Sequence, residues 1–441
     1  MQDNINTKIN FKSDTFKKYF KNTSWLFFEK IIRVILGAFV VISITNYLGP
    51  SDFGLYSYAL SFAGIFTVIA TLGIDTILTR ELINNKERMN ILLGTGLGLK
   101  LIGALISLAL LSIALIFTNQ DRFTNFLIFI IALSPIFQSF NVVDSYFQSK
   151  VQSKYSVIAQ SSSFIISSVI KLALIIINSS LLSFVVFTTA EYVFLAITYL
   201  ITYKSIGLNI FDWKFEMKLA ITFLKDSWPL ILSGIVITIY MKIDQIMIKQ
   251  MLGIAEVGYY AAAVRLSEAW YFLPLIITSS LFPAIVITKN INEKLFLSRM
   301  QKLYDLLAWI SISIALLTTF FSKEIIDILY KPEFMPAVPV LTIYIWAGVF
   351  VFLGVASTQF LIAENFTKIA FYRSFIGMVL NVILNYFLIP KYGIVGSALA
   401  TLISYSVATF FLFFNIKTRI QTTLMLKSVL FFDLFKLIKK K

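Results

Sequence analysis

Twelve long apolar segments follow one another along this 441-residue chain, and they constrain its fold more strongly than any other feature. A helix that crosses a bilayer needs about 20 mainly apolar residues. Because a chain in lipid satisfies its backbone hydrogen bonds only as helices or closed barrels, the pattern predicts an all-α integral membrane protein. The spans are predicted at residues 26–48, 55–78, 91–117, 123–147, 156–177, 183–203, 227–249, 258–287, 304–322, 337–361, 369–389 and 393–416.

The composition agrees with a chain that lies in lipid. Hydrophobic residues make up 58% of it and charged residues 14%, whereas a soluble domain is about 25% charged. The chain has no cysteine and no histidine, which excludes disulfides, His-ligated metals, and Ser-His-Asp or Cys-His catalysis. It also lacks the GxxxxGKS/T sequence that cradles nucleotide phosphates. We therefore expect no enzyme activity and no bound cofactor or metal.

Basic residues are distributed unevenly between the predicted loops. If the N-terminus is cytoplasmic, most of the 38 lysines and arginines fall in or next to cytoplasmic segments. This asymmetry predicts a multi-pass membrane protein with both termini in the cytoplasm. The net charge of +15 is then explained by anionic membrane lipids as partners, so no nucleic-acid partner is expected. The first apolar segment is too long for a cleavable signal peptide.

A short motif occurs once in each half of the chain. The run LGPSDFGLY at residues 48–56 reappears 204 residues later as LGIAEVGYY at residues 252–260. Each copy joins the first and second spans of a six-span half, which predicts a parallel repeat about an axis along the membrane normal. A common tight turn between helices is the alternative explanation. The predicted segments are a basic cytoplasmic N-terminus (1–22), an N-lobe (23–203), a cytoplasmic linker (204–226), a C-lobe (227–416) and a basic amphipathic cytoplasmic tail (417–441).

Three stretches of the chain carry a resemblance to a known family. They are the loop at residues 48–56, the run KIDQIMI at 242–248 followed by VGYYAAA at 257–263, and IPKYGIVGSA at 389–398. Together they resemble the polysaccharide-exporter family, the Wzx-type flippases of O-antigen or capsule repeat units. This family belongs to the superfamily of the MATE exporters and the lipid II flippase MurJ. The resemblance covers essentially the whole chain.

The resemblance implies two six-helix lobes around a central cavity that opens to each side of the membrane in turn. It implies a location in the bacterial cytoplasmic (inner) membrane and a polyprenyl-pyrophosphate-linked oligosaccharide as the cargo. It also implies a polysaccharide polymerase and chain-length proteins as possible partners. Movement of that cargo against a gradient requires an energy source. Since no ATP site is present, ion coupling is expected.

Basic residues lie inside the predicted spans, where a charge is costly and is usually kept for function or paired. Lys100 and Lys171 have no acidic residue within four positions on their own helices. Each therefore lines a cationic cavity or pairs with another helix. Guanidinium and ammonium groups form charge-assisted hydrogen bonds to pyrophosphate oxygens. The predicted cationic, substrate-binding cavity contains Arg33, Lys100, Lys242, Arg265, Lys171 and Arg373.

Acidic residues inside the spans have two possible roles. Glu29 with Arg33, and Arg265 with Glu268, are spaced as same-face pairs on one helix, which leaves a structural role open. Protonation of a buried carboxylate is also a simple coupling device, because burial disfavours the charged form. The ion-coupling candidates are Asp244, Glu191, Asp144 and Glu268, and the candidates for hydrogen bonds to sugar are Gln138, Asn141, Gln160 and Ser161–Ser163.

Two other functions are weighed against a flippase. A MATE-like exporter of small cations or drugs needs an acidic cavity, whereas the spans hold no excess of acidic residues. A membrane polymerase or ligase needs a sizeable outside loop, and the predicted loops are short. The glycine-rich run from Gly94 to Gly98 opens a predicted span, where we expect close helix packing rather than a phosphate loop. Kinks are expected at Pro135, Pro274 and Pro283.

Overall fold

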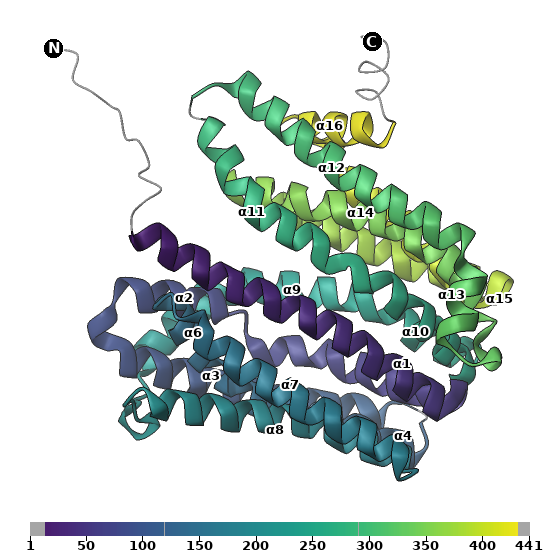
Figure 1. The fold of residues 1–441 in the computed structure, drawn as a ribbon, viewed down its shortest axis with the longest axis horizontal. Helices are drawn as coiled ribbons and strands as arrows, with labels where there is room; N and C mark the ends of the chain where they lie inside the picture. Colours follow the sequence, from purple (N-terminus) through teal and green to yellow (C-terminus); the bar gives the residue numbers. More distant parts are fainter. Residues whose placement is uncertain (1–13, 119, 290, 431–441) are drawn as a thin grey trace.

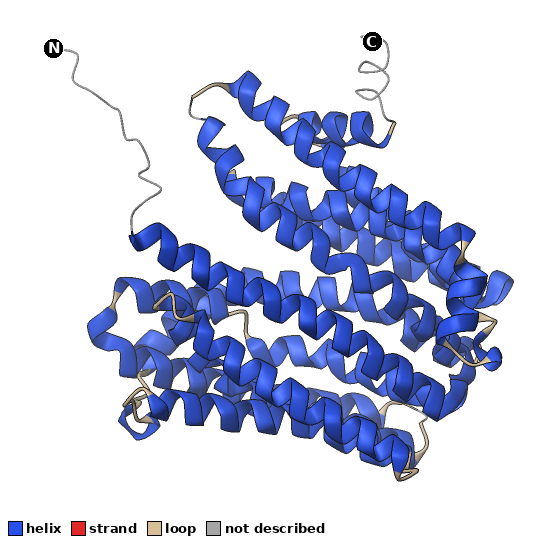
Figure 2. Cartoon of the chain, in the orientation of Figure 1, coloured by secondary structure: helices blue, strands red, loops and turns tan. Residues whose placement is uncertain are grey.

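The computed structural model describes residues 14–118, 120–289 and 291–430, and every regular element in these ranges is a helix (Figure 2). Ten helical segments of this described part are long and apolar enough to cross a membrane. Two of them, α1 (Asp14–Thr71) and α15 (Thr367–Phe410), turn back at a non-helical glycine, Gly49 with φ 71° and Gly393 with φ 61°. Each crosses twice, which confirms the predicted all-α fold with twelve spans.

The first lobe consists of α1 to α8, and its helices break where the sequence disfavours a continuous helix. The second span ends at Thr71, before Gly73 with φ 59°, whereas the sequence predicts residue 78. The fourth span is divided into three short helices, and Pro135 lies in the first turn of the second of them. The elements after α1 are α2 (Asp75–Asn84), η1 (Lys86–Arg88), α3 (Met89–Ile116), α4 (Arg122–Ala132), α5 (Ser134–Gln138), η2 (Ser139–Asn141), α6 (Val142–Ser149), α7 (Ser153–Ile176) and α8 (Leu181–Ser205).

The second lobe consists of α9 to α15, with α16 packed on α12. Its second span breaks at the turn η4, just before Pro274, whereas Pro283 lies inside the continuous helix α11. The elements are η3 (Ile210–Asp212) in the linker, then α9 (Met217–Met251), α10 (Ile254–Glu268), η4 (Ala269–Tyr271), α11 (Phe272–Lys289), α12 (Glu293–Phe320), α13 (Ser322–Leu329), η5 (Pro332–Phe334), α14 (Ala337–Ala363), α15, η6 (Phe411–Phe414) and α16 (Arg419–Val429).

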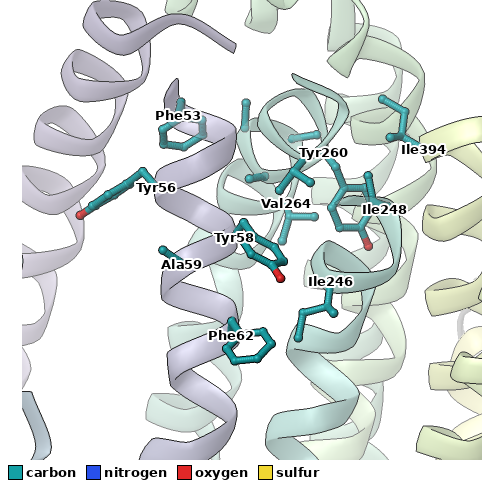
Figure 3. Close-up of a cluster of buried hydrophobic side chains, with 14 of the residues drawn as sticks. Phe53, Tyr56, Tyr58, Ala59, Phe62, Ile246, Ile248, Tyr260, Val264 and Ile394 are labelled. Carbon is teal, nitrogen blue, oxygen red and sulfur yellow. The ribbon is translucent and has the colours of Figure 1, made fainter. Parts of the chain in front are cut away.

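The two lobes converge at one end of the molecule, which we call the closed end (Figure 1). It contains the turns at Gly49, Gly253 and Gly393. The opposite, open end contains the start of α1, and the helices α11 and α12 rise away from α1 toward it (Figure 1). A buried apolar cluster joins the lobes at the closed end (Figure 3). Its members include Phe53, Tyr58 and Phe62 from α1 and Ile246, Tyr260 and Val264 from α9 and α10.

The repeated motif forms the contact between the lobes at this end. Its first glycine adopts positive φ in both copies, 71° at Gly49 and 115° at Gly253, which suits a residue without a side chain. Its second glycine allows direct backbone contact. A Cβ atom on Gly54 would lie 2.0 Å from the Ile254 carbonyl oxygen, and one on Gly258 would lie 2.0 Å from the Pro50 carbonyl oxygen. The two contacts are equivalent under the 204-residue repeat, so the motif forms a symmetric helix crossing.

A second seam runs from the closed end toward the open end, between the second half of α1 and α9. Ser61 donates a hydrogen bond to Gln245 Oε1 at 2.9 Å. Farther along, a Cβ atom on Gly234 would lie 2.9 Å from Val68 Cγ1, and one on Gly73 would lie 3.0 Å from Leu230 Cβ. The lobes are therefore in contact along α1 and α9 and diverge on the side of the first half of α1 and α11 (Figure 1).

The linker between the lobes is bound to the first lobe. The Arg88 guanidinium forms an ion pair of 2.6 Å with Glu216, and the Lys214 amide donates to the Asn90 carbonyl. A Cβ atom on Gly94 would lie 2.6 Å from the backbone of Lys214, and one on Gly98 would lie 2.7 Å from the Phe215 ring. The predicted close packing at Gly94 and Gly98 is thus confirmed, with the linker as the partner.

Parts of two predicted segments lie outside the described residues. They are residues 1–13 of the basic N-terminus and residues 431–441 of the tail. The described part of the tail forms α16, which docks on α12 through polar groups. Tyr304 donates to Gln421 Oε1 at 2.8 Å, and Gln301 donates to Ser428 Oγ at 2.7 Å.

Candidate transport site

A cavity of about 210 Å³ brings candidate cations of both lobes together. Most of its walls belong to the first lobe, whereas Arg265 comes from α10 of the second lobe. Lys171 of α7 lines the same space. The lining residues are Gly37, Val40, Val41, Ile44, Phe53, Tyr56, Leu60, Phe164, Ser168, Lys171, Thr188 and Arg265. We call this space the inter-lobe cavity.

Lys171 forms an ion pair with Glu191 of α8, with 2.7 Å between Nζ and Oε2. Ser167 also donates to Glu191 Oε2, at 2.9 Å. The sequence left open whether Lys171 pairs with another helix, and the structure shows that it does. Glu191, a candidate for ion coupling, is therefore the counter-ion of a candidate cargo-binding lysine.

Arg265 and Glu268 were spaced as a same-face pair, but these two side chains form no ion pair within the described residues. The Arg265 guanidinium instead lies 5.9 Å from the centroid of the Phe53 ring, on the first lobe. The Glu268 carboxylate accepts a hydrogen bond from Tyr344 at 3.2 Å. Lys242 is half-buried on α9. Among the described residues, no carboxylate oxygen lies within 4.0 Å of the Arg265 guanidinium, which enters the inter-lobe cavity.

Arg33 lies beside the same cavity. Its guanidinium lies 5.6 Å from the centroid of Phe164, a ring that lines the cavity, and it donates to Gln160 Oε1 at 3.3 Å. Gln160 in turn donates to the Tyr199 hydroxyl at 2.8 Å. The structure thus brings a predicted cation and a predicted sugar-binding amide into contact. The side chain of Glu29, the other candidate partner of Arg33, lies outside the described residues.

Lys100 lies away from the inter-lobe cavity, at the open end of the first lobe. Its ammonium is buried and forms an ion pair with Asp75 of α2. Gln138 and Asn141 line a small space of about 30 Å³ beside this pair. Asp144 lies nearby and accepts a hydrogen bond from Gln148 at 2.8 Å. These residues form a polar group separate from the inter-lobe cavity. Lys100 pairs with an acid on another helix, which is one of the two possibilities that the sequence left open.

Asp244 is buried in the second lobe and is surrounded by neutral donors. Tyr260, Thr401 and Asn385 donate to its carboxylate at 2.5, 2.6 and 2.7 Å. Asn381 accepts from Asn385 at 3.1 Å, which completes the cluster. Within the described residues no lysine or arginine nitrogen lies within 4.0 Å of this carboxylate. The cluster therefore contains a buried carboxyl group without a fixed counter-ion among the described residues.

The partners of Asp244 were not identified from the sequence. Asn381 and Asn385 are four residues apart in the apolar stretch that runs from Phe375 to Ile389, so they lie on one face of the helix. Two amides on one face of a membrane helix are costly unless they have polar partners. The sequence therefore contained a signal for a polar partner of this helix. It did not show which of the four acidic candidates was that partner.

Arg373 lies apart from the other candidates, inside the second lobe. Its guanidinium donates to Ser357 Oγ at 2.7 Å, to Thr358 Oγ1 at 2.5 Å and to the Gly354 carbonyl at 3.1 Å. All of these acceptors are neutral. Among the described residues it forms no ion pair. The structure therefore divides the six predicted cavity cations: Arg33, Lys171 and Arg265 lie at the inter-lobe cavity, and Lys242 lies near Glu268, with Lys100 and Arg373 elsewhere.

Hydrogen bonds connect the two lobes at the closed end. Asn46 of α1 donates to the Leu329 carbonyl at 2.8 Å and accepts from the Lys331 amide at 2.9 Å. Lys249 of α9 donates to Gln120. These bonds therefore join the two lobes at the closed end.

Comparisons with known proteins agree with this architecture. The lipid II flippase MurJ, in an inward closed conformation, superposes with a TM-score of 0.69 at 19% identity, over 95% of this chain and 93% of MurJ. An inward-facing multidrug resistance MATE transporter superposes with a TM-score of 0.70 at 13% identity, over 90% of this chain and 96% of the transporter. At these identities the likeness shows the fold alone.

Sequence relatives match only in part. Agl15 of Haloferax volcanii, a probable low-salt glycan biosynthesis flippase, is 30% identical over 159 residues, which are 35% of this chain and 33% of that protein. The matched stretches of two uncharacterized membrane proteins of Methanocaldococcus jannaschii span 19% and 47% of their lengths. The chain thus matches less than half of the length of each of these curated relatives.

The family models cover more of the chain. The MatE model matches residues 229–387, which lie in the second lobe. The model described as polysaccharide biosynthesis protein matches residues 19–289, which is more than half of the chain. The match over more than half of the chain shows that it belongs to the polysaccharide biosynthesis protein family, and its fold is the one that the MATE transporter and MurJ share.

Proposed function

We propose that this protein moves a polyprenyl-pyrophosphate-linked oligosaccharide across the cytoplasmic membrane by alternating access, coupled to a cation. The observation that carries the proposal is the inter-lobe cavity, where Arg265 of one lobe and Lys171 of the other face the same space and Arg33 lies beside it. A site formed by both lobes loses part of its ligands when the lobes separate. The motion that opens the site to the other side of the membrane therefore also releases the bound anion. The family, and the description of Agl15 as a flippase, support this choice of cargo.

The pyrophosphate is expected to bind to Arg33 and Arg265. A guanidinium offers several N–H donors to phosphate oxygens, and these bonds gain strength where water is excluded. Lys171 contributes less net charge, because Glu191 neutralises it. The lipid chain would remain in the bilayer, on the side where the first half of α1 and α11 diverge (Figure 1).

We assign ion coupling to Asp244 rather than to Glu191, Asp144 or Glu268. Its carboxylate is fully buried, and only neutral groups donate to it. A proton or a small monovalent cation would neutralise that charge, and the oxygens of Asn381, Asn385 and Thr401 lie beside it to bind a cation. The next residue, Gln245, accepts the hydrogen bond from Ser61 of the other lobe. Occupancy of the Asp244 cluster can therefore change a contact between the lobes.

The predicted orientation completes the cycle. With both termini in the cytoplasm, the closed end faces outward and the inter-lobe cavity is loaded from the cytoplasmic side. Opening of the symmetric crossing at Gly54 and Gly258 would then release the cargo on the outer side. Cargo transfer to a polymerase, under the control of chain-length proteins, would follow outside this chain.

The test is to delete the gene in its host and to locate the lipid-linked repeat unit in each leaflet, with surface polysaccharide measured in parallel. We expect the unit to accumulate on the cytoplasmic leaflet and the surface polymer to be lost. The variant Arg265→Gln should fail to restore export, whereas Arg122→Gln, which removes an exposed arginine at the closed end, should restore it. Normal surface polymer in the deletion strain would contradict the proposal.

The alternative is a MATE-like exporter of small molecules, which the match of the MatE model to the second lobe keeps open. It predicts that the deletion strain becomes sensitive to cationic drugs and retains its surface polysaccharide. The same strain therefore separates the two functions.

A further inference from the structure

A second cavity of about 210 Å³ lies entirely within the second lobe. Its walls come from α9, η4, α14 and both halves of α15. They include Tyr240, Tyr271, Phe350, Thr358, Arg373 and Tyr405. Ile237 at its rim is 45% exposed, so the cavity is not sealed. We call it the C-lobe cavity. It shares no lining residue with the inter-lobe cavity.

Arg373 gives this cavity one positive charge without a carboxylate to balance it. An arginine inside a membrane protein is normally paired with an acid, because an isolated charge is costly there. Here the partners among the described residues are two hydroxyls and one carbonyl. A guanidinium has five N–H donors, and three hydrogen bonds leave two of them for a ligand. The site therefore favours a ligand with a single negative charge on oxygen.

The remaining walls suit a sugar ring. The rings of Tyr240 and Tyr405 lie with their centroids 4.5 Å apart, and both line the cavity. Aromatic faces pack against the C–H face of a pyranose, while phenol hydroxyls can bond its hydroxyls. The Tyr240 hydroxyl is buried and forms no hydrogen bond to any described residue. A buried hydroxyl without a partner is costly, and a ligand hydroxyl would satisfy it.

We propose that the C-lobe cavity binds an acidic sugar unit of the cargo, such as a uronic acid, with its carboxylate on Arg373. This inference rests on the proposed function and specifies its substrate class. A pyrophosphate, which carries more than one charge, is better matched by the group of cations at the inter-lobe cavity. A single arginine among tyrosines matches one carboxylate on a sugar ring. Tyr240 lies one helical turn from Asp244, so this site adjoins the ion-coupling cluster.

The binding test uses the full purified chain in lipid nanodiscs, with glucuronate, glucose and inorganic phosphate as separate probes. A ligand that binds only the folded state raises the unfolding temperature in proportion to its affinity. We expect glucuronate to raise it and glucose not to. Arg373→Gln should weaken glucuronate binding at least tenfold, which corresponds to about 1.4 kcal/mol. Arg373→Lys should restore part of that loss, and Arg122→Gln, at an exposed arginine that lines neither cavity, should leave glucuronate binding unchanged.

Three results would overturn the proposal. They are equal shifts with glucuronate and glucose, a glucuronate shift that persists in Arg373→Gln, and a phosphate shift that Arg373→Gln removes, which would indicate a general oxyanion site in the C-lobe cavity. If Arg373→Gln does not fold, Tyr240→Phe replaces it, since it removes one hydroxyl and should weaken glucuronate binding severalfold. Binding is measured without transport, so a failure here is distinguishable from a failure of the flippase proposal, which the deletion strain tests.

Discussion

The two lobes handle buried charge in opposite ways. In the first lobe, Lys100 and Lys171 each form an ion pair with an acid on another helix, Asp75 and Glu191. In the second lobe, Asp244 and Arg373 are each surrounded by neutral groups and do not meet. Both lobes have six spans and share a repeat, so the difference does not arise from architecture.

This contrast indicates that buried charges have different roles in the two lobes. In an ion pair, the attraction between the two charges offsets the cost of their desolvation. The pair then stabilises one arrangement of helices as long as both partners are present. An unpaired buried charge is costly to the fold and is retained where a ligand or ion supplies the missing partner. We infer that the first lobe is the more rigid body and that the second lobe contains the ligand-dependent groups.

The largest effect is expected from Asp244→Asn. This change keeps the shape and removes the charge, so the protein should fold with unchanged or higher thermal stability and lose at least 90% of its transport. Export of lipid-linked oligosaccharide and the unfolding temperature of the purified protein measure the two quantities. As the control, Asp305→Asn removes a carboxylate near α16 and should retain transport. Normal export by Asp244→Asn would contradict the inference that the second lobe contains the ligand-dependent charge.

The next effect concerns the Lys171–Glu191 pair, whose side chains are 11% and 28% exposed. Removal of one partner of a buried pair costs about 3 kcal/mol or more, because the other charge is left alone. Lys171→Met and Glu191→Gln should each destabilise the protein by about that amount, and the double variant should recover a large part. Thermal unfolding of the four proteins gives the coupling energy. Additive effects of the two single changes would show that the pair is not a unit.

A smaller loss is expected for the Lys100–Asp75 pair. Lys100 is buried, but the Asp75 side chain is 52% exposed, so water screens the interaction. Lys100→Met leaves only this half-exposed carboxylate, which water can solvate, so it should lower stability by about 1 kcal/mol, less than Lys171→Met. Unfolding temperatures of the two variants, compared in one lipid mixture, test this order. The reverse order would mean that exposure does not control the strength of these pairs.

The smallest effect is expected from Ser61→Ala, which removes the hydrogen bond to Gln245 between the lobes. A neutral hydrogen bond contributes about 1 kcal/mol, so stability should change little. Transport should fall severalfold if this bond relays the state of the Asp244 cluster to the first lobe. Thr67→Ala, which removes a hydroxyl bonded within α1, is the matched control. Equal transport by the two variants would place the relay elsewhere.

The sequence predicted the helices better than the partners of their side chains. Span lengths follow from the hydrophobic pattern, which is local. Eight of the twelve predicted spans coincide with separate helical segments, and the other four are the two halves of α1 and the two halves of α15. The pairing of Lys171 with Glu191 depends on how α7 and α8 are rotated about their axes, which the pattern of one helix does not specify. For the same reason Asn381, Asn385 and Thr401 were not connected with Asp244.

The symmetric crossing of Gly54 and Gly258 has a consequence for the origin of the chain. Gly54 contacts the backbone of Ile254, and Gly258 contacts the backbone of Pro50, which is the equivalent position in the other half. The contact is therefore self-complementary, as in a two-fold symmetric dimer. A six-helix ancestor with this motif could have paired with a second copy of itself through the same surface. Fusion of two such copies would have preserved the crossing while the rest of each half diverged, one toward paired charges and the other toward charges that await a ligand.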